Sequence, residues 1–257
     1  DVMIFPFNTM ALRCPCRSLL VVHDLVSLFY AENFPGRLGR FREWAQPRLV
    51  AASARKANRV LAVSEFARQE LIHKCGVSPE KTEVVHHGVD KDLVRDCGED
   101  MEPPSELREA MRDPYVLFVG YQHLHKNLDR LALAFAAMKN RYQVPHRLLI
   151  AGKEESGSRS LQMTLRNLGR NDILVLGRVP GSALVPLYRH ASLFVFPSLY
   201  EGFGIPPLEA MAHGVPVAAS NAGPVPEVVG DAAVLFDPLD VDSMADAMGS
   251  VLTNPSL

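Results

Sequence analysis

Short apolar runs alternate with helical segments through the second half of this 257-residue chain, and this alternation limits the folds open to it. The apolar runs lie at residues 115–119, 147–151, 173–176, 193–196 and 215–219. Helical patterns follow at residues 128–138, 160–168, 182–190, 207–213 and 244–252. Strands that are apolar along almost their whole length are buried on both faces, which is typical of parallel sheets covered by helices. The pattern predicts an α/β fold with a doubly wound parallel sheet.

A second, shorter set of strand-length runs occupies the first part of the chain, at residues 1–7, 19–22, 60–63 and 82–85. Helical patterns lie at residues 36–59 and 64–76, and Pro47 is expected to break or offset the first of them. Strands that alternate with helices again predict an α/β unit.

The best linker candidate is the charged stretch at residues 96–113, which contains Pro103 and Pro104. We therefore predict two α/β domains, at residues 1–107 and 108–257. Because only three or four strands precede the linker, the N-terminal domain is expected to be truncated.

Charge and composition exclude several classes of protein. The formal net charge is −2, so no overall basic surface suggests a nucleic-acid partner. No apolar stretch approaches the length of a membrane span, and no signal peptide is visible. The four cysteines lack the spacing of a zinc site, which favours reduced thiols in a cytoplasmic protein. Residues 36–59 are locally basic, either as a solvated helix face or as a surface for anionic lipid or an anionic acceptor.

The strongest motif spans residues 197–210, where a glycine-rich loop follows an apolar run and precedes a helix expected to begin near Pro206 or Pro207. Backbone N–H groups at the start of a helix attract phosphate, and glycine lets a ligand approach the backbone closely. Glu209, expected in the first helical turn, suits a ribose diol, and Glu201 could reach another part of the same ligand. Taken singly, Glu209 could instead favour the helix dipole and Glu201 could be a surface residue.

The frame from Glu201 to Glu209 resembles the signature of retaining glycosyltransferases of family 4, which have the GT-B fold of two Rossmann-like domains facing a cleft. The resemblance is closest to bacterial polysaccharide mannosyltransferases. It implies that residues 1–107 form a partial acceptor-side Rossmann-like domain and residues 108–257 the nucleotide-sugar-binding Rossmann-like domain. It extends to the segments at residues 22–24, 63–66, 85–90, 118–127 and 222–227, with His87 where the family has Asn.

The resemblance implies a set of site residues. Three would be catalytic: His23 near the transferred sugar, Glu201 on the donor sugar, and Lys126 on the donor diphosphate. The others would bind the nucleotide, with Glu209 on the ribose: Glu209, Gly202, Phe203, Gly204, Ile205 and Gly120. Independently of the resemblance, a cation just before a helix suits a diphosphate leaving group, because its charge offsets the charge that develops there.

One departure from the family concerns a second cation for the phosphates. The family often places an arginine shortly before the lysine, but Tyr121 and His125 occupy that stretch here. Arg178 or Arg130 could take its place.

The resemblance implies a metal-independent, retaining hexosyltransferase of polysaccharide biosynthesis with a nucleotide-diphosphate sugar donor and no other cofactor. The donor order expected is GDP-mannose, then UDP-glucose or UDP-N-acetylglucosamine. The acceptor would be a glycan or a lipid-linked glycan, and the enzyme could contact the inner membrane face peripherally. Two alternatives stay open: a non-catalytic sugar-nucleotide-binding module, and a nicotinamide-dependent oxidoreductase. The incomplete Gly-x-Gly-x-x-Gly fingerprint speaks against the oxidoreductase.

Overall fold

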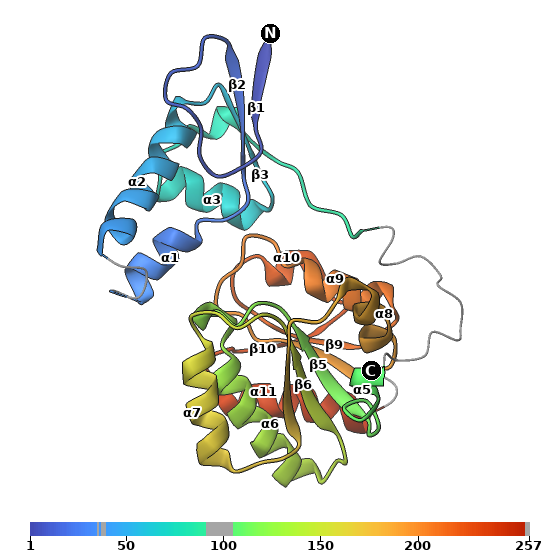
Figure 1. Cartoon of the computed structure of the whole chain (residues 1–257). Helices are drawn as coiled ribbons and strands as arrows, with labels where there is room; N and C mark the ends of the chain where they lie inside the picture. The colour runs from blue at the N-terminus through green and yellow to red at the C-terminus, as the bar shows by residue number, and fades with distance from the viewer. Residues whose placement is uncertain (35, 37–39, 91–104, 255–257) are drawn as a thin grey trace. The chain divides into compact units, whose positions relative to one another are not determined.

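The computed structural model describes residues 1–34, 36, 40–90 and 105–254, and these form two compact units (Figure 1). Unit 1 comprises Asp1–Gly88 together with Tyr200–Gly204, and unit 2 comprises Val89–Leu199 and Ile205–Leu257. Both units are α/β, as the sequence predicts. A five-residue stretch of the strongest sequence motif thus belongs to unit 1, although the residues on either side of it belong to unit 2.

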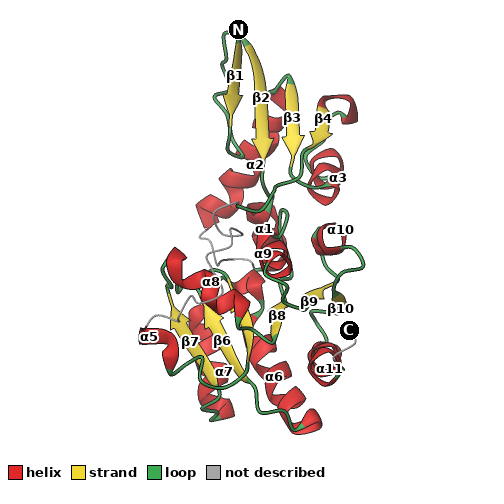
Figure 2. Cartoon of the chain, turned by 90° about the vertical axis from the view of Figure 1, so that its right-hand side faces the viewer, coloured by secondary structure: helices red, strands yellow, loops and turns green. Residues whose placement is uncertain are grey.

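Unit 1 is built on a four-stranded parallel sheet of order β1-β2-β3-β4, whose strands lie side by side in Figure 2. Its elements are β1 (Val2–Phe5), β2 (Arg17–Val22), α1 (Val26–Asn33), α2 (Arg40–Lys56), β3 (Arg59–Ala62), α3 (Glu65–His73), the 3₁₀ turn η1 (Pro79–Lys81) and β4 (Thr82–Val84). Ser64 begins α3 as the sequence suggests, because its hydroxyl accepts a hydrogen bond from the N–H of Ala67.

Two features of unit 1 differ from expectation. The helix α2 runs through Pro47 without a break, so the proline removes one N–H donor but does not end the helix. The helix α1 is not indicated by the sequence, because its apolar residues form no stripe with helical spacing.

Unit 2 is built on a six-stranded parallel sheet of order β10-β9-β8-β5-β6-β7. Its strands are β5 (Tyr115–Val119), β6 (Arg147–Ala151), β7 (Ile173–Gly177), β8 (Leu193–Phe196), β9 (Val217–Ser220) and β10 (Val234–Phe236). Its helices are α5 (Ser105–Arg108), η2 (Leu124–Lys126), α6 (Leu128–Tyr142), α7 (Ser158–Leu168), α8 (Gly181–Arg189), α9 (Ile205–Ala212), α10 (Val225–Val229) and α11 (Val241–Thr253). The strand order reverses between β5 and β8, which is the doubly wound arrangement predicted.

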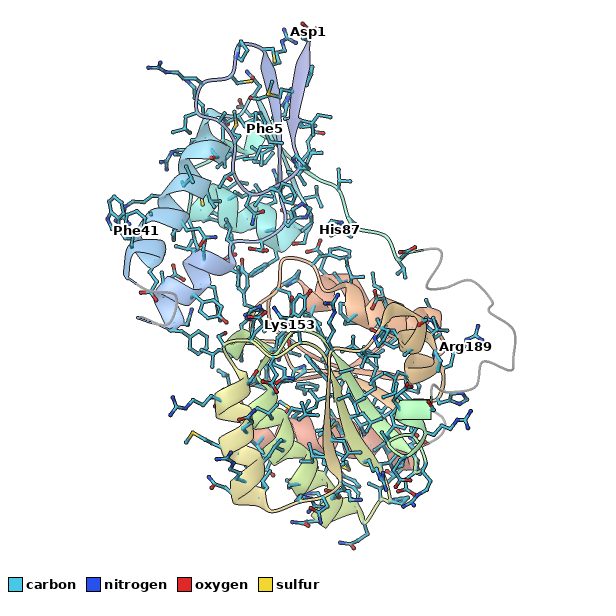
Figure 3. All side chains as sticks on the ribbon, viewed as in Figure 1. Asp1, Phe5, Phe41, His87, Lys153 and Arg189 are labelled. Atoms are coloured by element: carbon cyan, nitrogen blue, oxygen red, sulfur yellow. The ribbon has the colours of Figure 1, made fainter. Side chains whose placement is uncertain are left out.

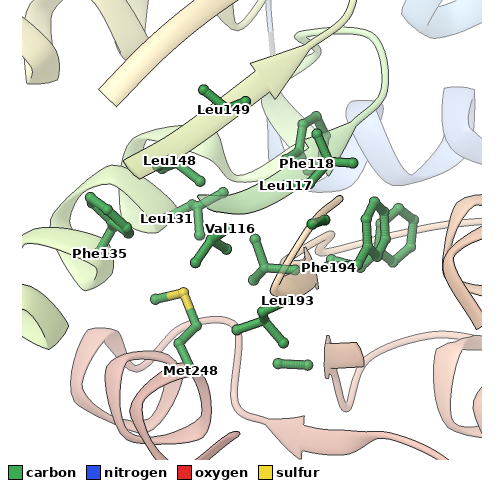
Figure 4. Packing of buried hydrophobic residues seen from close by; sticks show 14 of the residues in the cluster. Val116, Leu117, Phe118, Leu131, Phe135, Leu148, Leu149, Leu193, Phe194 and Met248 are labelled. Carbon is green, nitrogen blue, oxygen red and sulfur yellow. The ribbon is translucent and has the colours of Figure 1, made fainter. Parts of the chain in front are cut away.

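The helices of unit 2 cover both faces of this sheet, with α6, α7 and α11 on one side and α8, α9 and α10 on the other (Figure 1). Side chains from the central strands fill the core between the layers, as Figure 4 shows for Val116, Leu148 and Leu193 near Phe135 and Met248. All five of these side chains are fully buried. A core covered on both faces explains why the strand sequences are almost entirely apolar.

The sequence predicts the central strands of unit 2 better than its periphery. The segments expected at 115–119, 147–151 and 193–196 are strands with those bounds. The edge strand β10 and the short helix α10 are not indicated by the pattern. Of the linker expected at residues 96–113, residues 96–104 lie outside the described residues. The remaining part contains the short helix α5 and a buried Ala110.

Candidate active site

A pocket of about 390 Å³ lies in unit 2 at the carboxyl ends of β5, β6 and β7, beside the point where the strand order reverses. Ligands of open α/β sheets bind at this edge. Its lining residues are Val119, Gly120, Tyr121, Lys126, Ala151, Gly152, Lys153, Arg178, Val179, Leu184 and Pro206. Three of them are cations, so the pocket offers concentrated positive charge beside apolar walls.

Two glycines bring the ends of β5 and β6 together in the pocket. A Cβ on Gly152 would lie 1.8 Å from the carbonyl oxygen of Gly120. Only a residue without a side chain allows this approach, because the obstacle is backbone. The N–H of Gly120 donates to the carbonyl of Ala151 at 2.9 Å, which fixes the two strand ends relative to each other.

Lys126 ends the turn η2, and its Nζ lies 5.4 Å from the centre of the Phe196 ring. Asn127, which follows, adopts a left-handed conformation with φ 60° and is 1% exposed. Its amide nitrogen donates to the carbonyls of Pro197 and Pro238 at 3.1 and 2.7 Å. Asn127 therefore fixes the lysine-bearing turn to the loops after β8 and β10.

The residues near Lys126 differ in whether they can supply a second cation for the donor phosphates. Burial, and then the Lys126 charge, lower the pKa of His125 to about 2, so this imidazole is neutral. Arg130 donates to the side-chain oxygen of Asn127 at 3.0 Å. Of the two arginines that the sequence suggests, Arg178 lines the pocket with Lys126. Lys153 also lines it, and its ammonium pairs with Glu155 at 2.8 Å; Figure 3 labels its position.

Glu209 lies in the second turn of α9 rather than the first, because the helix begins at Ile205 instead of at the prolines. Its Oε2 accepts a hydrogen bond from the hydroxyl of the buried Tyr188 at 2.7 Å. The Tyr188 ring in turn stacks on His213 with ring centres 5.4 Å apart. Tyr188 thus holds one oxygen of the carboxylate, and the other keeps its capacity to accept hydrogen bonds.

The stretch Tyr200–Gly204, here called the Glu201 turn, packs within unit 1. The hydroxyl of Ser64 donates to the Gly202 carbonyl at 2.7 Å. The Phe203 ring contacts the rings of His86 and His87, with centres 5.6 and 5.5 Å away. Gly204 has φ +107°, a conformation that favours glycine.

His23 follows β2 at its carboxyl end, as the sequence predicts. Its ring stacks on His87 at 5.3 Å, and its Nδ1 lies 3.3 Å from the His87 Nε2. Its Nε2 lies 2.8 Å from the carbonyl of Pro6. Burial raises the pKa of the neighbouring Asp24 carboxyl, and the Glu201 carboxylate raises it further. Glu201 and Asp24 are therefore close enough to repel each other.

The predicted site residues fall into three groups. Gly120 and Lys126 line the unit 2 pocket, and Ile205 and Glu209 lie on the neighbouring helix α9 without lining it. The residues in unit 1 are His23, Glu201, Gly202, Phe203 and Gly204. The sequence does not indicate Tyr188. Asn127 lies in the segment 118–127 that resembles the family, but the sequence assigns it no role of its own.

Two Asp-x-Asp triplets, a pattern that can hold a metal-bound diphosphate, occur at residues 90–92 and 240–242. In the second, Asp240 caps α11 by accepting hydrogen bonds from the N–H groups of Asp242 and Ser243. Asp242 itself pairs with Arg141 at 2.7 Å. Its carboxylates therefore have structural partners, and the first triplet lies partly outside the described residues.

Two family models match this chain, and together they cover nearly all of it. The model described as glycosyl transferases group 1 matches residues 102–257, and the one described as Glycosyltransferase Family 4 matches residues 3–93.

Curated relatives include bacterial mannosyltransferases. The serotype-specific mannosyltransferase WbdA of Escherichia coli is 29% identical over 246 residues, which cover 93% of this chain and 30% of WbdA. The O-antigen chain mannosyltransferase B of Escherichia coli is 31% identical over 230 residues, covering 89% of this chain and 59% of that protein. The chain thus spans less than two thirds of the length of either relative.

Solved structures with the same fold include a sucrose-phosphate synthase from Thermosynechococcus elongatus, with TM-score 0.73, 23% identity, and coverage of 95% of this chain and 60% of that one. Another is HepE from Anabaena in complex with UDP, with TM-score 0.68, 21% identity, and coverage of 93% and 63%. Two Rossmann-like units in one chain agree with the predicted GT-B fold. With more than half its length matched by one family model, this chain belongs to the group 1 glycosyltransferases.

Proposed function

We propose that this chain transfers a hexose, mannose in the first instance, from GDP-mannose to a glycan or lipid-linked acceptor. The observation that carries the proposal is the unit 2 pocket at the carboxyl edge of the sheet, where Lys126, Lys153 and Arg178 face one space. A nucleoside diphosphate has the charge that such a pocket attracts. The names of the relatives, two of which are mannosyltransferases, support mannose as the sugar.

Lys126 and Arg178 are proposed to bind the donor diphosphate. The phosphate gains negative charge as the sugar leaves, so fixed cations stabilise the transition state more than the ground state. Arg178 takes the place of the family's second cation, because the neutral His125 carries no positive charge. Glu209, held by Tyr188, is proposed to accept hydrogen bonds from the ribose, and Glu201 and His23 to contact the transferred sugar.

The proposed reaction retains configuration and uses no metal. The bond between the anomeric carbon and the phosphate oxygen breaks, and a bond to the acceptor oxygen forms on the same face of the sugar. The acceptor proton passes to the departing phosphate. The protein contributes positioning and charge stabilisation rather than a nucleophile. Full transfer in the presence of a chelator and an α-linked product from an α-linked donor are the expected results; a chelator-sensitive rate or an inverted product would contradict this.

Nucleotide binding is the first property to measure, with a thermal-shift panel of GDP, UDP, dTDP, ADP and NAD. A ligand at ~100 times its dissociation constant stabilises the native state by ~2.7 kcal/mol, which raises the melting temperature visibly. We expect GDP to give the largest shift and Glu209→Ala to lose most of it. A larger shift with UDP would change the donor, and a shift with NAD alone would favour the oxidoreductase.

A non-catalytic sugar-nucleotide-binding module is the second candidate, since Tyr121 and the neutral His125 occupy the stretch where the family often has a second phosphate cation. It predicts the same nucleotide shift without turnover. Release of GDP from GDP-mannose in the presence of a glycan acceptor separates the two, because only the enzyme releases GDP in repeated turnovers at a rate that Lys126→Ala lowers.

We further propose that α2 contacts an anionic membrane surface. Among the described residues, no helix has both the length and the apolarity to cross a bilayer. On α2, Val50 and Ala54 are buried, whereas Phe41 and Trp44 are 78% and 57% exposed. Figure 3 shows Phe41 projecting from this helix, and the Arg48 guanidinium lies 4.9 Å from the Trp44 ring centre. Exposed aromatic rings beside cations are typical of helices that lie at a membrane interface.

Trp44 is the only tryptophan in the chain, so its fluorescence reports on this contact directly. We expect its emission to shift to the blue with phosphatidylglycerol-containing vesicles but not with pure phosphatidylcholine vesicles. High salt should reverse the shift, because screening weakens attraction between charges at a surface. An unchanged spectrum with the anionic vesicles would contradict the proposal, and a blue shift that grows with protein concentration alone would indicate self-association.

A further inference from the structure

Tyr200, next to the proposed sugar-binding Glu201, is a buried side chain of unit 1 with both hydrogen bonds and ring contacts. It is 4% exposed. Its hydroxyl donates to the Glu70 Oε2 at 2.6 Å and accepts from the N–H of Leu25 at 3.0 Å. Its ring stacks on Phe29 and meets Phe66 edge-on, with ring centres 4.7 and 5.8 Å away. The side chain is therefore fixed both by the packing of its ring and by the two hydrogen bonds of its hydroxyl.

The partner of the Tyr200 hydroxyl is a buried carboxylate with a second partner of its own. Glu70, in α3, is 8% exposed, and its Oε1 pairs with the Lys74 ammonium at 2.9 Å. Hydrogen bonds to a charged acceptor are shorter and stronger than neutral ones. Burial, and then the Glu70 charge, raise the pKa of Tyr200, so its hydroxyl stays protonated and remains a donor.

The other side of Glu201 is fixed as well. The Gly202 carbonyl accepts from the Ser64 hydroxyl at 2.7 Å. The Gly202 α-carbon packs so closely on the backbone of His23 that a Cβ would lie 1.7 Å from its carbonyl oxygen. Glu201 is thus held between two residues that are both secured to unit 1, at the end of β2 and along α1 and α3.

We propose that Tyr200 is a positioning residue for Glu201, acting through its hydrogen bonds to Glu70 and Leu25. The proposal rests on the proposed function, in which Glu201 contacts the transferred sugar. Without the hydroxyl, the Glu70 Oε2 and the Leu25 N–H both lose a buried partner, and the Glu201 turn keeps its apolar packing and the Ser64 hydrogen bond but loses its hydrogen bonds on the Tyr200 side. Misplacing a contact group by about 1 Å can lower turnover by as much as ~10²-fold.

The test compares Tyr200→Phe with Tyr142→Phe. The control removes the same group, a hydroxyl that donates to a carboxylate, since the Tyr142 hydroxyl donates to Asp246 at 2.9 Å on an exposed face of unit 2. Three quantities are measured: the amide hydrogen exchange of the peptide containing residues 200–204, kcat for sugar transfer, and the dissociation constant of GDP.

For Tyr200→Phe we expect faster exchange in that peptide, kcat lowered ~10-fold or more, and an unchanged GDP affinity, because the diphosphate cations lie in unit 2. Tyr142→Phe should leave all three unchanged. Unchanged exchange overturns the anchor, and faster exchange with wild-type kcat overturns the positioning role. If the wild-type protein transfers no sugar, the proposed function fails, while the exchange measurement still decides whether Tyr200 anchors the turn.

Discussion

Replacing Lys126 by alanine is expected to lower kcat/KM for sugar transfer by ~10²-fold or more, the usual size for the loss of one preorganised charge at a transition state. The lysine lines the unit 2 pocket on a turn that Asn127 fixes to two neighbouring loops, so its position is set before the donor binds. Because the leaving diphosphate gains charge during the reaction, kcat should fall more than donor affinity.

The matched control is Arg166→Ala, which removes one positive charge from an exposed position on α7. It should leave kcat/KM and the melting temperature as they are. Steady-state kinetics with a fixed acceptor measure both variants, and circular dichroism verifies their folding. Full activity of a folded Lys126→Ala protein would show that the diphosphate assignment is wrong.

Gly202→Ala is expected to displace the Glu201 turn and to lower turnover strongly. Its new methyl group would lie 1.7 Å from the carbonyl oxygen of His23 and 2.9 Å from the Asp24 Cβ. The first obstacle is backbone at the end of a strand, so the turn must move rather than a flexible side chain. A shift of this size can cost as much as ~10²-fold in rate, and overpacking of this kind destabilises by ~1–3 kcal/mol.

Gly181→Ala provides the comparison for this variant, because a Cβ at the start of α8 meets no atom within 4 Å and the backbone there needs no positive φ. We expect wild-type kinetics and stability for it. The measurements are kcat, the dissociation constant of GDP, and the melting temperature. A Gly202→Ala protein with wild-type kcat would mean that the position of Glu201 does not limit the reaction.

The parts of the fold predicted from the sequence are those that local patterning determines. The strands β5 and β8 are apolar throughout because helices cover both faces of their sheet, and this leaves a clear signal in the sequence. The helix α1 leaves none, since its burial depends on contacts with α2 rather than on an apolar stripe of its own. Pro47 misleads because a long helix tolerates the loss of one hydrogen bond.

The same distinction between local patterns and distant contacts applies to the residues of the candidate site. Lys126 and Glu209 stand out in the sequence because each lies in a recognisable loop or helix motif. Their supports do not, because Tyr188 reaches Glu209 across 21 residues and Asn127 reaches Pro238 across 111. The Tyr200–Glu70 hydrogen bond joins residues 130 positions apart. Such pairs follow from the way the chain folds back on itself, which no local pattern records.

The assignment of the Glu201 turn to unit 1 has a practical consequence for exchanging parts between relatives. A chimera with a single crossover between the two sheets would take residues 1–88 from one parent. It would take the Glu201 turn, with Tyr200 and Phe203, from the other parent. The ring pocket of Phe29 and Phe66 would then receive a foreign tyrosine, and Ser64 a foreign carbonyl. A functional recombinant would instead need three crossover points, so that residues 200–204 are inherited together with the N-terminal unit.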